Sequence, residues 1–92
     1  MKVLVRAFAR FRDVMGESSS YELPDKSDLS ALLSLIASRS EENRALLFDN
    51  QEQLRGHIIV MVNRKRVSRK AIGQLPLFDG DEVALYPPVA GG

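Results

Sequence analysis

The end of the chain holds the residues whose chemistry is easiest to name. It reads Pro87-Pro88-Val89-Ala90-Gly91-Gly92. Glycine has no Cβ, so a Gly-Gly end can thread a narrow channel and bend at its far side. The Pro-Pro pair favours polyproline geometry, which would project the end away from the domain before it. We therefore expect residues 87–92 to form a flexible tail, disordered from residue 89 onward, that can enter another protein's active site.

The group in this tail that could react is the α-carboxylate of Gly92. A free carboxylate is ionised at neutral pH and is a poor electrophile in that form. It would first need activation, for instance as an acyl-adenylate made by a separate ATP-using enzyme, and the acyl group would then pass to a sulfur or an amine. The chain would supply the acyl group and its shape, and the partner would supply the catalysis. The alternative is a frayed chain end without a role, which is common for termini.

Composition narrows the other possibilities. A chain of 92 residues makes one domain, expected over residues 1–86. The net charge of +1, from 13 basic and 12 acidic residues, gives no general reason to expect nucleic acid or a membrane as partner. Without cysteine and with His57 as the single histidine, we expect no metal site, no cysteine nucleophile and no bound cofactor. The first apolar run is short and broken by Arg6, so it predicts no signal peptide and no membrane span, and we expect a cytoplasmic protein.

Hydrophobic periodicity predicts the elements of the first half. Residues 2–10 alternate as a strand, and residues 20–23 form a second strand after a turn at residues 15–20. Ser27 is the expected N-cap of a helix over residues 27–38, because apolar residues recur there at helical spacing. These apolar residues are Leu29, Leu32, Leu33 and Ile36. A shorter helix is expected over residues 41–48.

The second half is predicted to be mostly strands. Residues 57–62 are rich in β-branched side chains and indicate a buried central strand that begins at His57. Asn63 and Arg64 would turn the chain into a short edge strand over residues 65–67, and residues 82–86 would form the last strand after an Asp79-Gly80 turn. The order β-β-α-β-β-β predicts an α+β fold in which a mixed sheet of about five strands wraps on one main helix.

Two motifs resemble a known family. Residues 77–92, Leu-Phe-Asp-Gly-Asp-Glu-Val-Ala-Leu-Tyr-Pro-Pro-Val-Ala-Gly-Gly, resemble the C-terminus of the small subunit of molybdopterin synthase. Residues 3–12, Val-Leu-Val-Arg-Ala-Phe-Ala-Arg-Phe-Arg, followed by Gly16, resemble the first strand of that family. The resemblance covers nearly the whole chain and implies the ubiquitin-like β-grasp fold, in which strands one and five are neighbours. The same superfamily includes thiamine-pathway sulfur carriers and small archaeal modifier proteins.

The resemblance also implies a function. An E1-like enzyme would adenylate Gly92, with Gly91 as its partner in the tail, and the product would become a thiocarboxylate. The chain would then serve as the small subunit of molybdopterin synthase in molybdenum cofactor biosynthesis, with the large subunit as a second partner. The alternative is a ubiquitin-like modifier joined through Gly92 to lysines of target proteins. The middle of the chain, longer than in the simplest carriers, and a basic hairpin depart from the family pattern.

An apolar face is expected on the outer side of the sheet. Strand alternation assigns to it Phe8, Ile59, Met61, Ala84 and Tyr86. One helix covers only one face of a sheet, and an exposed apolar patch usually marks a partner surface. We expect Phe8 and Tyr86, with Ile59 and Met61, to bind the activating enzyme. The alternative is a set of scattered surface residues, or residues that a loop covers.

A basic segment follows the predicted third strand. Its charged residues are Arg64, Lys65, Arg66, Arg69 and Lys70. They could bind RNA or an acidic partner, although a solvated hairpin is the commoner explanation and no aromatic residues are interleaved for base stacking. A third possibility for the whole chain is therefore a non-catalytic β-grasp binding module. The terminal Gly-Gly argues against it, because such a module needs no free end.

Overall fold

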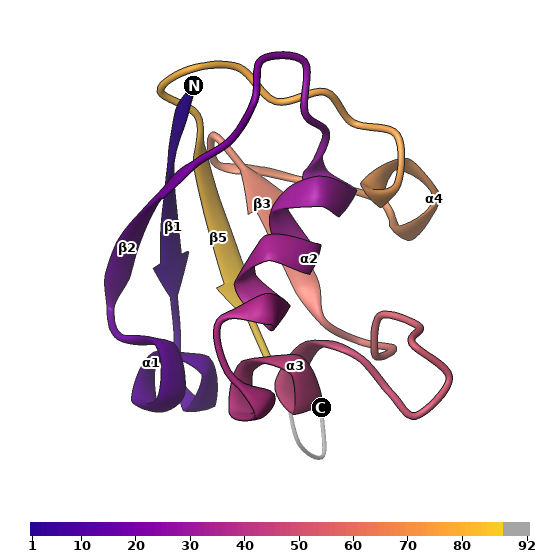
Figure 1. Cartoon of the computed structure of the whole chain (residues 1–92). Coiled ribbons are helices and arrows are strands. Elements are labelled where there is room, and N and C mark those ends of the chain that lie inside the picture. The colour runs from indigo at the N-terminus through magenta and orange to yellow at the C-terminus, as the bar shows by residue number, and fades with distance from the viewer. Residues whose placement is uncertain (88–92) are drawn as a thin grey trace.

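The fold is an α+β arrangement, which we describe from a computed structural model. The structure describes residues 1–87, and residues 88–92 lie outside the described part (Figure 1). The elements in chain order are β1 (Lys2–Ala7), α1 (Arg10–Met15), β2 (Ser18–Glu22), α2 (Leu29–Ser38), α3 (Glu41–Leu47), β3 (Ile59–Val62), β4 (Lys65–Arg66), α4 (Arg69–Ile72) and β5 (Glu82–Tyr86). The strands form one sheet in the order β2-β1-β5-β3-β4. β1 and β5 pair in parallel and the other pairs are antiparallel, so the sheet is mixed, as the sequence predicts.

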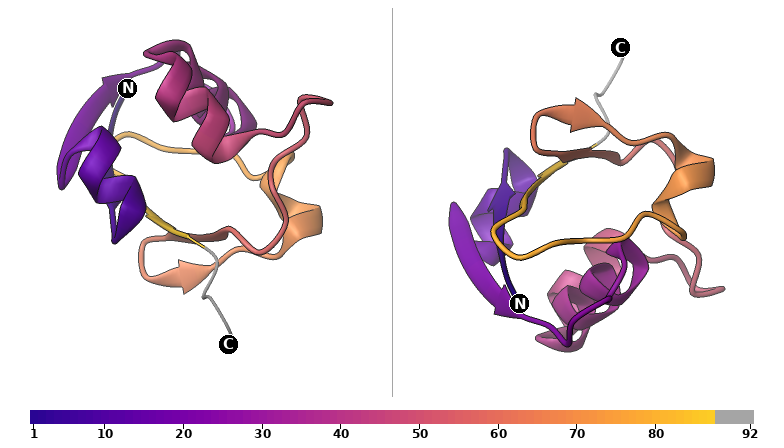
Figure 2. Two further views of the ribbon diagram at one scale, coloured as in Figure 1. Left: turned by 90° about the horizontal axis from the view of Figure 1, so that it is seen from below. Right: turned by 90° about the horizontal axis from the view of Figure 1, so that it is seen from above.

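The core lies between α2 and the inner face of the sheet. Figure 1 shows α2 running across the strands, and Figure 2 shows α2 and α3 together on one side of the curved sheet. Every apolar residue at the helical spacing of α2 is buried, and so are alternate residues of β1 and β5. These strand residues are Val3, Val5, Ala7, Val83 and Leu85. Burying a side chain of this size stabilises the fold by about 1.5–3 kcal/mol, which fixes the register of both strands.

The N-cap of the main helix lies one residue later than the sequence suggests. Asp28 is its N-cap, and its carboxylate accepts a hydrogen bond of 2.9 Å from the backbone N–H of Ala31. Ser27, the expected cap, instead donates from its hydroxyl to the carbonyl of Pro24 at 2.7 Å. The prediction of Ser27 as cap was therefore wrong, because that residue closes the preceding turn. The shorter helix is confirmed as α3, which ends at Leu47.

The first strand is shorter than its alternating pattern indicates. β1 ends at Ala7, and Ala9 adopts a left-handed backbone conformation with φ of 54° as the N-cap of α1. Helix α1 was not predicted, and neither was the extent of β2, which includes the serines assigned to a turn. A signal for α1 exists in the sequence, since Phe11 and Met15 are four residues apart and both pack on the core.

Three details of the second half also differ from expectation. β3 lies between β5 and β4, so the centre of the sheet is β5 rather than β3. His57 precedes β3 with a left-handed φ of 69° and does not begin the strand. The one-turn helix α4 was not predicted. The edge strand and the last strand are found where the sequence indicates them.

The two ends of the sheet differ in what they carry. Because β1 and β5 run in parallel, both begin at one end of the sheet and finish at the other. The N-terminus and the loop before β5 lie at the first end, and β5 leaves the sheet at the second (Figure 1). Within residues 1–87, no helix is long and apolar enough to cross a membrane.

Candidate functional site

The tail begins at the centre of the sheet. β5 ends at Tyr86 and Pro87 follows it, whereas Pro88, Val89, Ala90, Gly91 and Gly92 lie outside the described residues. The last strand is held on both sides up to its last two residues. On one side Tyr86 pairs with Ile59 of β3, and on the other the N–H of Phe8 donates to the carbonyl of Leu85 at 3.2 Å. The position from which the tail starts is therefore fixed by two neighbouring strands.

Two aromatic rings stand beside this starting point. Phe8 and Tyr86 stack in parallel, with 4.4 Å between ring centroids and 7° between ring planes. The guanidinium carbon of Arg6 lies over the Phe8 ring, 5.7 Å from its centroid. Parallel pairing of β1 with β5 brings residues 8 and 86 together, since Ala7 is opposite Leu85 in the register. The two rings thus lie side by side on the outer face, the face to which the sequence assigns them.

The aromatic pair belongs to a larger apolar surface on the outer face. Ile59 is paired with Tyr86, and Met61 with Ala84, in the antiparallel β3–β5 register. Residues directly opposite each other in an antiparallel pair point to the same face. We call Phe8, Ile59, Met61, Ala84 and Tyr86 the outer-face patch. All five are half-buried, so apolar surface is left open beside the start of the tail.

A shallow hollow of about 180 Å³ lies on this patch. Its lining consists of Arg6, Phe8, Met61, Arg64, Glu82, Ala84 and Tyr86. Arg6 and Glu82 form an ion pair of 3.4 Å across it, between side chains that are 45% and 38% exposed. A pair as exposed as this one contributes at most about 1 kcal/mol to stability. Its main effect is that the carboxylate of Glu82, which lines the hollow, is already paired with a cation.

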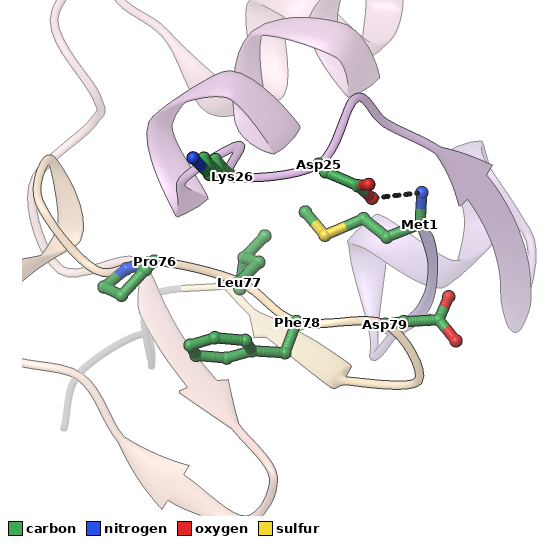
Figure 3. Close-up of a pocket in the computed structure, with 7 residues that line it drawn as sticks. All are labelled: Met1, Asp25, Lys26, Pro76, Leu77, Phe78 and Asp79. Atoms are coloured by element: carbon green, nitrogen blue, oxygen red, sulfur yellow. Dashed lines mark hydrogen bonds and ion pairs between the residues drawn. The ribbon is translucent and has the colours of Figure 1, made fainter.

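A second hollow, of about 330 Å³, lies at the opposite end of the sheet (Figure 3). Met1 lines it with a side chain that is 3% exposed, and the Met1 ammonium donates to the carbonyl of Leu23 at 2.8 Å and lies 3.5 Å from a carboxylate oxygen of Asp25. Phe78 stands at its rim with 65% of its surface exposed. The sequence reasoning did not single out Phe78. It lies in the loop before β5, far along the strand from where the tail starts, and so is not part of the surface beside the tail.

A third, more polar hollow of about 510 Å³ lies between α1, α3 and the segment before β3. Asp49 lines it, and hydrogen bonds from the backbone N–H groups of Gln53 and Gln51 hold the pKa of this carboxyl below its ordinary value. Asp49 therefore orders its own loop. No group of three or more potential metal ligands occurs in the part of the chain that the structure describes.

The fold and the start of the tail define a class of protein. A mixed sheet in the order β2-β1-β5-β3-β4, crossed by one main helix and continued from its central strand into a C-terminal Gly-Gly, is that of the ubiquitin-like β-grasp proteins. The chain belongs to the ThiS family, whose model matches residues 5–92.

Two curated relatives match over nearly their whole lengths. Small archaeal modifier protein 3 of Haloferax volcanii is 31% identical over 93 residues, which covers 100% of both chains. The molybdopterin synthase sulfur carrier subunit of Escherichia coli is 33% identical over 90 residues, covering 98% of this chain and 99% of the relative. The relatives therefore agree with the resemblance seen in the sequence and include both functions weighed there.

Solved structures confirm the predicted fold. The crystal structure of SAMP1 from Haloferax volcanii superposes with a TM-score of 0.86 at 24% identity, covering 100% of both chains. A chain of the protein–protein complex of subunits 1 and 2 of the molybdopterin-converting factor from Helicobacter pylori superposes with a TM-score of 0.66 at 26% identity, again covering 100% of both. The second structure is of a chain like this one in complex with another protein.

Proposed function

We propose that this protein is a sulfur carrier whose reacting group is the C-terminal carboxylate of Gly92. On an E1-like enzyme, a carboxylate oxygen attacks the α-phosphorus of ATP, a P–O bond forms, and pyrophosphate leaves. A hydrosulfide ion then attacks the acyl carbon, a C–S bond forms, and AMP leaves as its C–O bond breaks, so that the end becomes a thiocarboxylate. ATP is used by the partner enzyme, and the carrier works in the cytoplasm beside it.

The observation that supports this proposal is the position of β5. Its end, at the centre of the sheet, is flanked by the outer-face patch, and five residues follow Pro87 in the sequence. A fully extended chain of five residues spans at most about 18 Å. An enzyme that binds the patch therefore has the Gly-Gly end within reach of its active site. The domain, residues 1–86, serves for binding and the tail, residues 87–92, for reaction.

The pathway that we favour as the user of this sulfur is molybdopterin synthesis. The E. coli relative is named as the sulfur carrier subunit of molybdopterin synthase, and the H. pylori structure pairs subunit 1 of the converting factor with subunit 2. By analogy, the thiocarboxylate of this chain would enter the active site of a large synthase subunit. That subunit would bind the same outer-face patch after the activating enzyme has left.

A second candidate function is protein modification. It is favoured by the match to small archaeal modifier protein 3, which covers 100% of both chains. Here the ε-amine of a target lysine attacks the activated carbonyl of Gly92, an isopeptide bond forms, and the activating group leaves. Both functions use the same adenylate, and they differ in the nucleophile that consumes it.

Mass spectrometry of protein purified from its native host tests both functions. A sulfur carrier shows a terminal mass gain equal to the exchange of one oxygen for one sulfur. A modifier leaves a remnant of its own C-terminus on lysines of other proteins, and after trypsin this remnant is residues 71–92, because no lysine or arginine follows Lys70. If neither species is found, and the host's E1-like enzyme shows no pyrophosphate exchange with the chain, both functions are excluded and a binding module replaces them.

A further inference from the structure

The outer-face patch is bordered by arginine side chains on both sides. The sheet registers align Arg6 with Ala84, Ala84 with Met61, and Met61 with Arg66. Side chains that are aligned in this way lie on the same face. A row across four strands therefore reads arginine, alanine, methionine, arginine, with both charged residues at the outside and apolar residues between them.

A third arginine reaches the patch from the turn between β3 and β4. Val62 pairs with Lys65, so the turn has two residues, Asn63 and Arg64, with φ of 50° and 70°. Two positive φ values are typical of a type I′ turn, in which Asn-Gly is the favoured pair. A side chain at the glycine position costs of order 1 kcal/mol or more. Arg64 occupies that position, and its side chain lines the hollow on the patch. The chain therefore carries an unfavourable residue in the turn at the point where its side chain reaches the patch.

The acidic residues close to the patch are already engaged. The carboxylate of Glu82 pairs with Arg6. Asp81 accepts hydrogen bonds from the side-chain amide of Asn63 at 2.9 Å and from the N–H of Phe78 at 2.8 Å. Among residues 1–87, no carboxylate forms an ion pair with Arg64 or Arg66, both of which are exposed. The face therefore presents an apolar centre with two arginines available to a partner.

We propose that the outer-face patch docks on a protein surface whose apolar centre is flanked by carboxylates, and that Arg64 and Arg66 select it. This inference rests on the proposed function, in which the partner is the E1-like adenylating enzyme. Arginine suits such a rim because its planar fork binds carboxylates in a bidentate manner, and complementary charges at a rim speed association and exclude wrong partners.

An acidic protein fits this face better than RNA does. Binding of bases requires aromatic rings with open faces along a basic groove. The ring of Phe8 is instead stacked on Tyr86 and contacted by Arg6. Arg6 and Arg64 line the hollow and Arg66 is aligned with Met61, so the three arginines border an apolar centre rather than forming a groove.

Binding measurements with three charge-reversal variants test the inference. The full-length chain and the variants Arg64→Glu, Arg66→Glu and Lys65→Glu are titrated onto the adenylating enzyme of the same genome by calorimetry. Lys65 is the matched control because it is opposite Val62, which packs on the core, and so belongs to the other face of the same hairpin. We expect Kd to rise about tenfold for Arg64→Glu and Arg66→Glu and to change less than about twofold for Lys65→Glu.

Salt dependence and a glycine variant complete the test. Raising NaCl from about 0.1 M to about 1 M shortens the Debye length from about 10 Å to about 3 Å and should weaken wild-type binding more than binding of Arg64→Glu. Arg64→Gly should raise the melting temperature, because it relieves the turn, and still weaken binding.

Equal Kd values for wild type, Arg64→Glu and Arg66→Glu would overturn the inference and leave the proposed function intact. Absence of wild-type binding to the enzyme would overturn both the inference and the proposed function. Tight binding of wild type to single-stranded RNA, if Arg64→Glu abolishes it, would show that the partner of this face is RNA and not an acidic protein.

Discussion

Gly92 is the residue on which the proposed chemistry depends, and its position can be tested by single-residue changes. In the proposed activation step, the terminal carbonyl carbon would come to the α-phosphate of ATP. Deleting Gly92 shortens the reach by about 3.5 Å, and adding one residue after it replaces the carboxylate with a peptide bond. Since a misplacement of about 1 Å can lower a rate about a hundredfold, we expect either change to abolish ATP–pyrophosphate exchange with the E1-like enzyme.

Thermal unfolding is the control for this prediction. Among residues 1–87, every buried apolar residue of the core lies between Val3 and Leu85, so we expect neither change to remove a core contact. The melting temperature should therefore equal that of wild type. Exchange at the wild-type rate by the deletion variant would show that the tail is not the reacting group.

Tyr86 tests the outer-face patch at the scale of one side chain. Large aromatic side chains at the centre of an interface often contribute about 2 kcal/mol or more to binding. We expect Tyr86→Ala and Phe8→Ala each to raise the Kd for the E1-like enzyme more than about tenfold, measured by calorimetry.

Phe78→Ala is the matched control, because Phe78 is also an exposed aromatic and lies in the loop before β5, at the other end of the sheet. Its Kd should stay at the wild-type value. If Phe78→Ala weakens binding and Tyr86→Ala does not, the docking surface is the hollow of Figure 3 instead.

Among the elements, those with a strong hydrophobic period were predictable from sequence. The period of α2 and the alternation of β5 agree with the buried residues, because tertiary packing uses that same apolar face. Helix α1 was not predictable in this way. It depends on Ala9 turning into a left-handed conformation, whereas the residue pattern continues the strand without a break. Boundaries that depend on one backbone angle or on one cap are not specified by periodicity.

The cap of α2 provides a test of this kind of boundary. Asp28→Ala removes the hydrogen bond to the N–H of Ala31 and should lower the free energy of unfolding by about 1 kcal/mol. Ser27→Ala removes only a bond within the preceding turn and should cost less than half as much. Urea denaturation followed by circular dichroism measures both. A larger loss of unfolding free energy for Ser27→Ala than for Asp28→Ala would show that Ser27, the residue that the sequence favours, is the cap.

At the scale of the molecule, the candidate site was predictable only in part. Alternation alone assigns Phe8, Tyr86 and Met61 to the outer face. The arginines that border the patch could be predicted only with the strand order and registers, because Arg66 and Arg6 are far apart in sequence and lie on separate strands. The parallel pairing of β1 with β5 is what joins the parts: it brings the aromatic pair to the end of the sheet from which the tail departs.

This arrangement separates binding from reaction, and a truncated chain makes the separation measurable. A protein of residues 1–87 keeps every core residue that the structure describes and the outer-face patch, and it lacks Gly92. We expect it to fold with the melting temperature of the full chain and to bind the E1-like enzyme within about threefold of the wild-type Kd, because the patch supplies most of the affinity. It has no Gly-Gly carboxylate to adenylate. It should therefore inhibit pyrophosphate exchange of the full chain competitively, and the same truncation carrying Tyr86→Ala should not. Loss of binding on truncation would mean that the tail supplies most of the affinity, and the outer-face patch would then not be the docking surface.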